Sequence, residues 1–230
     1  MTHADHLLRI VPDLFSRRIL DVGSGRGAFI VDVAKRGAKA TGIEPYDVYR
    51  DMTQQRAQEA GVTVDVREGV AEKMPFTGGS FDFVNMCEVL EHVEDPLLSM
   101  REVARVLSST GLAYVSIPNR FGMKDQHFHL YFVNWMPRAW SDAFISRFGK
   151  HKEYTKNAGR QRLSEMHYYT YGGALQLMRG AGLSAEDARI KRIKKEMEYI
   201  SVLILPLYYI LRIFYFDSFH LLVRRSVDYV

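Results

Sequence analysis

Short apolar runs alternate with amphipathic stretches over the first 120 residues of the chain. Each run is bounded by turn-forming residues, which is typical of buried strands. Between the runs, apolar residues recur three or four positions apart, as on helices that pack against a sheet. Alternating strands and helices predict an α/β fold with a doubly wound, mostly parallel sheet. The strands are expected at 18–22, 39–43, 62–67, 81–86 and 112–117, and the helices at 28–36, 48–60 and 95–107.

The order of elements becomes less regular after Asn119. Residues 120–168 are rich in aromatic and basic side chains, and we expect them to form an insertion over the carboxyl edge of the sheet. Thr170 is a good cap for a helix that ends near Ala181, because a threonine oxygen can accept an amide of the first turn. Strands at 185–193 and 219–226 would complete a seven-stranded sheet as an antiparallel edge pair.

An apolar appendage of about 197–217 separates these last two strands. Its run 199–216 carries one charge, Arg212, and follows five bases within 189–195. The run is shorter than the roughly 20 residues that a spanning helix needs. We favour a helix that lies in a membrane interface, so that 189–216 gives peripheral membrane contact. A lid over the substrate pocket and a homodimer face are the alternatives.

Composition limits the class of protein. At 230 residues the chain is most simply a single domain, 1–230, and its 47% hydrophobic residues allow a packed core. The net charge of +4 is too small to predict nucleic-acid binding by itself, and we expect no nucleic-acid partner. One cysteine, Cys87, excludes an intrachain disulfide, and the first twenty residues lack a secretory apolar region. A cytoplasmic location is expected, with peripheral attachment to the inner face of the membrane as an option.

The chemistry-bearing motif lies near the start of the chain. Asp21 ends an apolar run, glycines follow at 23, 25 and 27, and Glu44 comes 21 residues after Gly23. Glycines let a backbone approach a ligand closely, and a carboxylate after the next strand can accept the hydroxyls of a ribose. A dinucleotide site instead prefers the spacing Gly-x-Gly-x-x-Gly. Asp21 would also repel a pyrophosphate, and it suits a ligand with a cationic group.

This motif resembles that of class I S-adenosylmethionine (SAM)-dependent methyltransferases. Further matching segments follow in the family's order at 42–45, 69–76, 80–84, 88–96 and 111–119. The resemblance covers about residues 15–120 and implies a Rossmann-like fold, a methyltransferase activity and SAM as the cofactor. The family usually has an acid where Val70 stands, so the resemblance assigns no adenine contact to that position.

The resemblance also implies a role for each matched residue. The glycines would form the turn under the methionine part, Asp21 would favour its cationic end, and Glu44 would hold the ribose. Other matched positions would cover the adenine or pass close to the methionine end. The cofactor-binding residues expected in this way are Asp21, Gly23, Ser24, Gly25, Gly27, Glu44, Pro45, Tyr46, Ala71, Glu72, Met74, Cys87 and Glu88.

Two histidines are candidates for catalysis at an oxygen acceptor, because histidine is the natural base near neutral pH. His92 follows the strand at 81–86, and His127 follows the strand at 112–117. Glu88, Glu91 and His92 also have the order Glu-x-x-Glu-His. This order resembles metal-assisted ubiquinone-biosynthesis and small-RNA methyltransferases, and it also occurs in class I enzymes without a metal. A divalent metal is therefore the less favoured alternative here.

The acceptor is predicted by resemblance alone. Segments 119–128 and 134–138 resemble methyltransferases of polysaccharide and glycolipid assembly, which favours O-methylation of a small or lipid-linked sugar acceptor. A quinone or phenol O-methyltransferase is the alternative within the same class. A non-catalytic scaffold at a membrane, with the SAM fold retained, is the alternative from another class.

Overall fold

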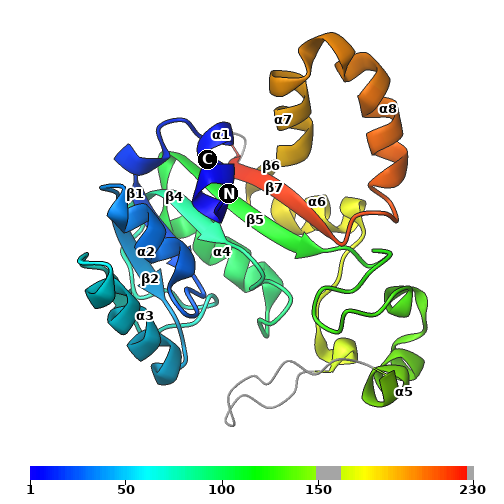
Figure 1. Ribbon diagram of the computed structural model, residues 1–230, viewed down its shortest axis with the longest axis horizontal. Helices are drawn as coiled ribbons and strands as arrows, with labels where there is room; N and C mark the ends of the chain where they lie inside the picture. The colour runs from blue at the N-terminus through cyan, green and yellow to red at the C-terminus, as the bar shows by residue number, and fades with distance from the viewer. Residues whose placement is uncertain (149–161, 227–230) are drawn as a thin grey trace.

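The computed structural model describes residues 1–148 and 162–226, and their strands form one mixed sheet (Figure 1). The strand order is β3-β2-β1-β4-β5-β7-β6. Strands β1 to β5 run parallel, whereas β7 pairs antiparallel with both β5 and β6. The strands are β1 (Arg18–Val22), β2 (Lys39–Ile43), β3 (Asp65–Arg67), β4 (Phe81–Met86), β5 (Leu107–Pro118), β6 (Leu183–Asp187) and β7 (Ser218–Arg225).

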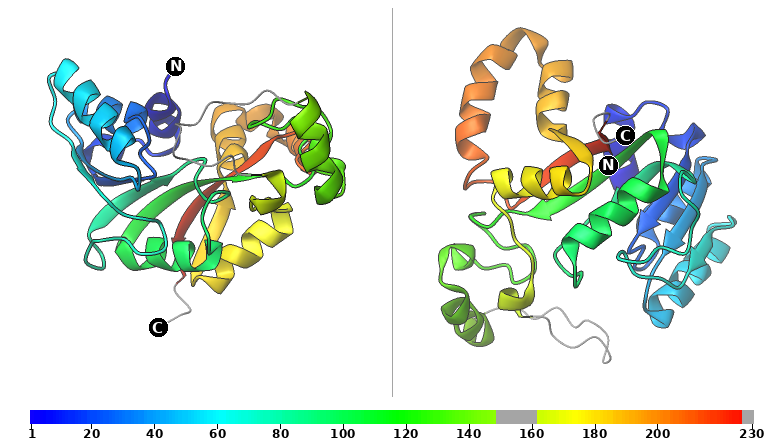
Figure 2. Two further views of the ribbon diagram at one scale, coloured as in Figure 1. Left: turned by 90° about the horizontal axis from the view of Figure 1, so that it is seen from below. Right: turned by 180° about the vertical axis from the view of Figure 1, so that it is seen from behind.

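Helices cover both faces of this sheet, as Figure 2 shows. One apolar core joins the sheet to α4 (Pro96–Val106) and α6 (Tyr171–Gly180). The core on the other face is built with α1 (His3–Ile10) and α2 (Ala28–Lys35), and α3 (Asp47–Glu59) packs beside α2. The prediction of a doubly wound, mostly parallel seven-stranded sheet is confirmed.

Local signals explain where the helices begin. The Asp95 carboxylate accepts the amides of Leu97 and Leu98, and Pro96 occupies the first position of α4, where no amide partner is needed. Thr170 caps α6 in the same way through the amide of Gly173. Both helix starts agree with the sequence prediction.

Two appendages leave the edge of the sheet where β5 ends and β7 begins (Figure 1). The first follows β5 and contains η2 (Val133–Trp135), α5 (Arg138–Phe148) and η3 (Leu163–Glu165). It corresponds to the predicted insertion 120–168, of which 149–161 lie outside the described residues. The second connects β6 to β7 through α7 (Ala188–Glu196), η4 (Glu198–Ile200) and α8 (Ser201–Leu211).

The prediction of a strand at 185–193 is wrong beyond residue 187. The chain turns there into α7, because the Asp187 carboxylate accepts the amides of Arg189 and Ile190 and caps a helix. The predicted strand at 62–67 is also shorter, since β3 pairs with β2 only over Asp65–Arg67. At the start of the chain, α1 is followed by the short turn η1 (Leu14–Ser16).

Candidate functional site

The glycine turn after β1 is folded as its spacing predicts. Gly23, Gly25 and Gly27 have φ values of 65°, 52° and 74°, a region that residues with a side chain rarely adopt. A Cβ on Gly27 would lie 2.6 Å from Cγ2 of Thr53, and one on Gly23 would lie 2.6 Å from Cγ2 of Val89. The turn is therefore packed between α3 and the loop that follows β4.

Glu44 is held at the end of β2 and is only 4% exposed. Its two carboxylate oxygens accept the amide of Gly25 at 2.9 Å and that of Tyr46 at 3.2 Å. Burial raises the pKa of Glu44, and these two amides partly oppose the rise. Because a carboxylate has about four lone-pair positions, both oxygens can accept further hydrogen bonds, as a ribose diol requires.

Asp21 lies near the carboxyl end of the inner strand β1 and is 4% exposed. Its Oδ1 accepts the side-chain amide of Asn85 at 2.7 Å, and Asn85 Oδ1 lies 2.9 Å from His3 Nε2. Burial raises the pKa of Asp21 to about 7; the Asn85 hydrogen bond opposes this and the charge of Glu44 adds to it. A cationic ligand would stabilise the ionised form, so the position suits an ammonium or sulfonium group.

The predicted adenine-side residues take different positions. Ala71 and Met74 are buried in the core beside α4 and α6, whereas Pro45 and Tyr46 are exposed. The Glu72 carboxylate accepts the amides of Glu94 and Asp95, so it holds the turn before α4. The contacts of these residues with a cofactor stay a prediction.

Three further predicted residues lie close to the turn. The hydroxyl of Ser24 is buried and has no hydrogen-bond partner among the described residues, so it has capacity to bind a ligand or a water molecule. Burial raises the pKa of the Cys87 thiol to about 12, which makes it a poor nucleophile. Glu88 adopts a left-handed φ of 56°, and its amide donates to Oγ of Ser116. The glycine turn, Ser24, Asp21 and Glu44 form a cradle whose two buried carboxylates and one hydroxyl suit the ammonium and ribose groups of an adenosyl cofactor.

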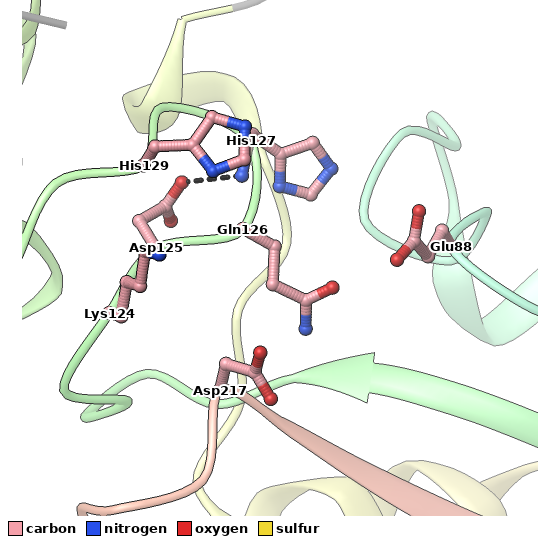
Figure 3. Close-up of a pocket in the computed structure, with 7 residues that line it drawn as sticks. All are labelled: Glu88, Lys124, Asp125, Gln126, His127, His129 and Asp217. Atoms are coloured by element: carbon pink, nitrogen blue, oxygen red, sulfur yellow. Dashed lines mark hydrogen bonds between the residues drawn. The ribbon is translucent and has the colours of Figure 1, made fainter. Parts of the chain in front are cut away.

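A cavity of about 300 Å³ lies next to this cradle (Figure 3). Glu88, in the loop after β4, lines this cavity, and so does Asp217, which directly precedes β7. The insertion supplies the remaining lining residues, which are Lys124, Asp125, Gln126, His127 and His129. The loop after β4 therefore contacts both features: its Glu88 lines the cavity, and the next residue, Val89, packs near Gly23 of the glycine turn.

The two candidate histidines lie side by side near this cavity. The rings of His92 and His127 have centroids 5.1 Å apart and are nearly perpendicular. His127 Nε2 lies 3.4 Å from Oε1 of Glu91, and His92 Nε2 lies 4.0 Å from the same oxygen. Burial acts to lower the pKa of His127, but the hydrogen bond and charge of Glu91, together with the charges of Asp125 and Glu88, outweigh it, so the pKa is raised.

Glu91 is an unusual carboxylate because it is fully buried and, within residues 1–148 and 162–226, neither of its oxygens has a well-aligned hydrogen-bond donor. Such a group is costly unless a nearby charge compensates it. One ligand atom each from Glu91, His92 and His127 falls within 4.8 Å of the others. This donor set fits a divalent cation, and a protonated His127 would be the other source of compensation.

A second set of contacts fixes the His127 ring. Its Nδ1 lies 3.1 Å from the hydroxyl of Tyr168, which donates to Asp125 Oδ2 at 2.7 Å. The other Asp125 oxygen accepts the amides of His127 and Phe128 at 2.8 Å. Both ring nitrogens of His127 therefore face protein groups.

Sequence reasoning missed three residues of this site. Asn85 could have been found, because it is a polar residue inside the apolar strand β4. Tyr168 and Asp217 gave no such signal, because they come from distant parts of the chain that meet only in the fold. The two histidines named from the sequence lie next to each other, although only His127 lines the cavity.

Comparison with known proteins finds similarity to methyltransferases. Residues 20–115 match a family model described as a methyltransferase domain. A ubiquinone biosynthesis O-methyltransferase of Azorhizobium caulinodans is 36% identical over 153 residues, which are 63% of this chain and 59% of that protein. One from Pseudomonas aeruginosa is 37% identical over 111 residues, or 46% of this chain and 47% of that protein. The chain thus spans about half of the length of these curated relatives.

Solved structures share the fold at low sequence identity. A putative sarcosine dimethylglycine methyltransferase from Galdieria sulphuraria superposes with a TM-score of 0.60 at 17% identity, covering 97% of this chain and 85% of that one. A SAM-dependent methyltransferase from Thermotoga maritima, described as a possible histamine N-methyltransferase, gives a TM-score of 0.51 at 20% identity and covers 80% and 74%. These structures support the Rossmann-like fold.

Proposed function

Since the chain belongs to the class I SAM-dependent methyltransferase family, we propose that it methylates an oxygen of a quinol- or phenol-type acceptor. The ubiquinone-biosynthesis names of the curated relatives support this acceptor. They give no support to the sugar or glycolipid acceptor that we first favoured from segments 119–128 and 134–138. The acceptor stays a proposal because the matched part covers 59% of the Azorhizobium protein.

SAM supplies an activated methyl group, so the protein mainly has to align the acceptor and exclude other geometries. Glu44 would accept the ribose hydroxyls, and Asp21 would compensate the cationic end of the cofactor. The backbone of the glycine turn leaves room for the ligand because Gly25 has no side chain; a Cβ there would meet only the carbonyl of Gly23, at 3.9 Å. The hydroxyl of Ser24 would gain the partner that it lacks.

The observation that carries the oxygen acceptor is the position of Glu91, His92 and His127 beside the cavity. A phenol must lose its proton to become a good nucleophile. The buried Glu91 carboxylate raises the pKa of His127, and Tyr168 fixes the ring, so the cluster is built to hold positive charge near the acceptor. Positive charge lowers the pKa of a nearby hydroxyl and favours its oxyanion.

A divalent cation is a second source of that charge, and the unpartnered oxygens of Glu91 favour it. Glu91, His92 and His127 would hold the ion. Bound there, it would supply Lewis-acid stabilisation of an acceptor oxyanion. His127 alone is a less suitable base, because a protein group faces each of its ring nitrogens.

The test is transfer of an isotopically labelled methyl group from SAM to four acceptors: a catechol, a hydroquinone, a phenol with an alkyl tail, and a sugar. We expect labelled ether products from the phenolic acceptors and none from the sugar. Glu91→Gln should reduce the rate at least about a hundredfold, since it removes the carboxylate that raises the pKa of His127 or would hold the cation, and with it the positive charge near the acceptor oxygen. Glu94→Gln is the matched control, because Glu94 is exposed in the same turn.

Two results would contradict the proposal. Labelled sugar with unlabelled phenols would return the acceptor to the glycolipid class. Failure of the unmodified chain to bind SAM would favour the non-catalytic scaffold. A retained rate in Glu91→Gln would remove the cluster from the chemistry while leaving methyl transfer itself intact.

A further inference from the structure

A helical hairpin leaves the sheet between β6 and β7 and points away from the rest of the molecule (Figures 1 and 2). Its tip carries the most exposed large apolar side chains of the described residues apart from Met1. Tyr199 is 99% exposed, and Val202 and Leu203 are each 77% exposed. Further along α8, Leu207 and Ile210 continue the same apolar surface. Exposed apolar surface of this extent marks an interaction site.

The base of the hairpin is firmly attached, so this exposure is not the result of a loose segment. The hydroxyl of Tyr208 donates to Oδ2 of the buried Asp187 at 2.7 Å. Arg212 approaches the same carboxylate at 3.6 Å and stacks over the ring of Tyr171 at 3.7 Å. The Asn119 side-chain amide donates to three carbonyls at the end of α8. A rigid base therefore presents an apolar tip.

Positive charge surrounds the tip. Residues 188–200 contain five bases and two acids, Glu196 and Glu198. Glu196 is shared between Arg9 at 3.7 Å and Arg192 at 3.8 Å. Lys194 and Lys195 are exposed in the last turn of α7, directly before the apolar residues, and the Lys195 ammonium also donates to the carbonyl of Arg9 at 2.9 Å. Basic residues beside apolar ones match the anionic headgroups and the acyl chains beneath them at a bilayer surface.

We infer that this hairpin tip, residues 194–203, docks on the surface of a membrane that contains anionic lipids. Val202 and Leu203 enter the acyl boundary, Tyr199 lies at the headgroup level, and the two lysines contact the phosphates. No helix in the described ranges is long and apolar enough to cross a membrane. A symmetric contact between two copies would bring the same positive charges together, which disfavours a dimer at the tip.

The experiment is sedimentation of the full chain with vesicles of phosphatidylcholine, either pure or containing phosphatidylglycerol. We expect binding that needs phosphatidylglycerol and weakens when salt is raised. The double variant Val202→Ser, Leu203→Ser should lower the partition coefficient about tenfold or more, because less apolar area is buried. The variant Lys194→Gln, Lys195→Gln should lower it roughly ten- to thirtyfold on the anionic vesicles.

Matched controls separate docking from general surface chemistry. Trp140→Ser removes an apolar side chain that is 71% exposed on α5, and Lys35→Gln, Lys39→Gln removes two exposed bases at the other end of the sheet; both should bind vesicles normally. Circular dichroism and SAM binding check that the variants fold. Absence of sedimentation, equal sedimentation on both vesicles, or a dimer in light scattering that the tip variant dissociates would each overturn the inference. None of these outcomes depends on methyl transfer.

Discussion

Replacement of Asp21 by asparagine should change how the stability of the protein depends on pH. Burial raises the pKa of Asp21 from its ordinary value of 3.8 to about 7 in the folded chain. The folded state therefore binds more protons than the unfolded state between these two values. As pH rises through this range, stability is lost, because the buried carboxyl group must ionise.

The size of the effect follows from the shift. One pKa unit corresponds to about 1.4 kcal/mol, so the wild-type chain loses on the order of 4 kcal/mol to this group above neutral pH. Roughly 3 kcal/mol of that loss falls between about pH 5 and about pH 8. Because Asn85 still has an oxygen to donate to in Asp21→Asn, the variant keeps that hydrogen bond and loses only the titration.

The assay is urea unfolding of wild type and Asp21→Asn at several pH values. The free energy of unfolding of the variant, relative to wild type, should rise steadily with pH. An unpaired amide in the variant would change the difference in unfolding free energy by the same amount at every pH. The slope of this difference against pH is therefore the diagnostic quantity. Asp51→Asn, at an exposed position on α3, is the control and should run parallel to wild type. Parallel curves for Asp21→Asn would refute the burial argument.

Three further outcomes are expected. Gly27→Ala should destabilise the chain by about 2–3 kcal/mol, because the alanine would need a left-handed φ and would place its Cβ close to Thr53. Thermal unfolding measures the loss of stability, with Gly37→Ala as the control. Asn119→Ala should cost roughly 1–3 kcal/mol through the lost contacts with the end of α8, and faster proteolysis within α8 would report it. Exhaustive chelation separates the two sources of positive charge: if Glu91, His92 and His127 hold a divalent cation, methyl transfer should fall at least about tenfold and recover on adding Mg²⁺ or Mn²⁺. An unchanged rate would assign the charge to protonated His127.

The sequence predicts the parts of the fold whose determinants are local. The glycine spacing and Glu44 identify the cradle because all of these residues lie in two adjacent strand–turn units, after β1 and after β2. Asp95 and Thr170 locate helix starts for the same reason. The strand prediction at 185–193 is wrong because the pattern of apolar and basic residues there fits both the strand period and the helix period. The cap that Asp187 makes favours the helix.

The arrangement around His127 depends on contacts that no local pattern contains. Glu91 and Tyr168 approach its ring from 36 residues before and 41 residues after it in the chain. Their convergence requires the insertion to fold back over the sheet edge. The sequence could therefore name the two histidines and Glu91, but not the burial of Glu91 or its approach to the His127 ring, which raises the pKa of His127.

The most direct test of the account is calorimetric titration of SAM into wild type, Glu44→Gln and the control Glu68→Gln, whose side chain is 80% exposed. Wild type and the control should bind SAM alike. Glu44→Gln should bind about ten- to a hundredfold more weakly, because it removes a charged acceptor from the ribose. Equal affinity in all three proteins, or no binding by wild type, would contradict the assignment of the cradle to an adenosyl cofactor.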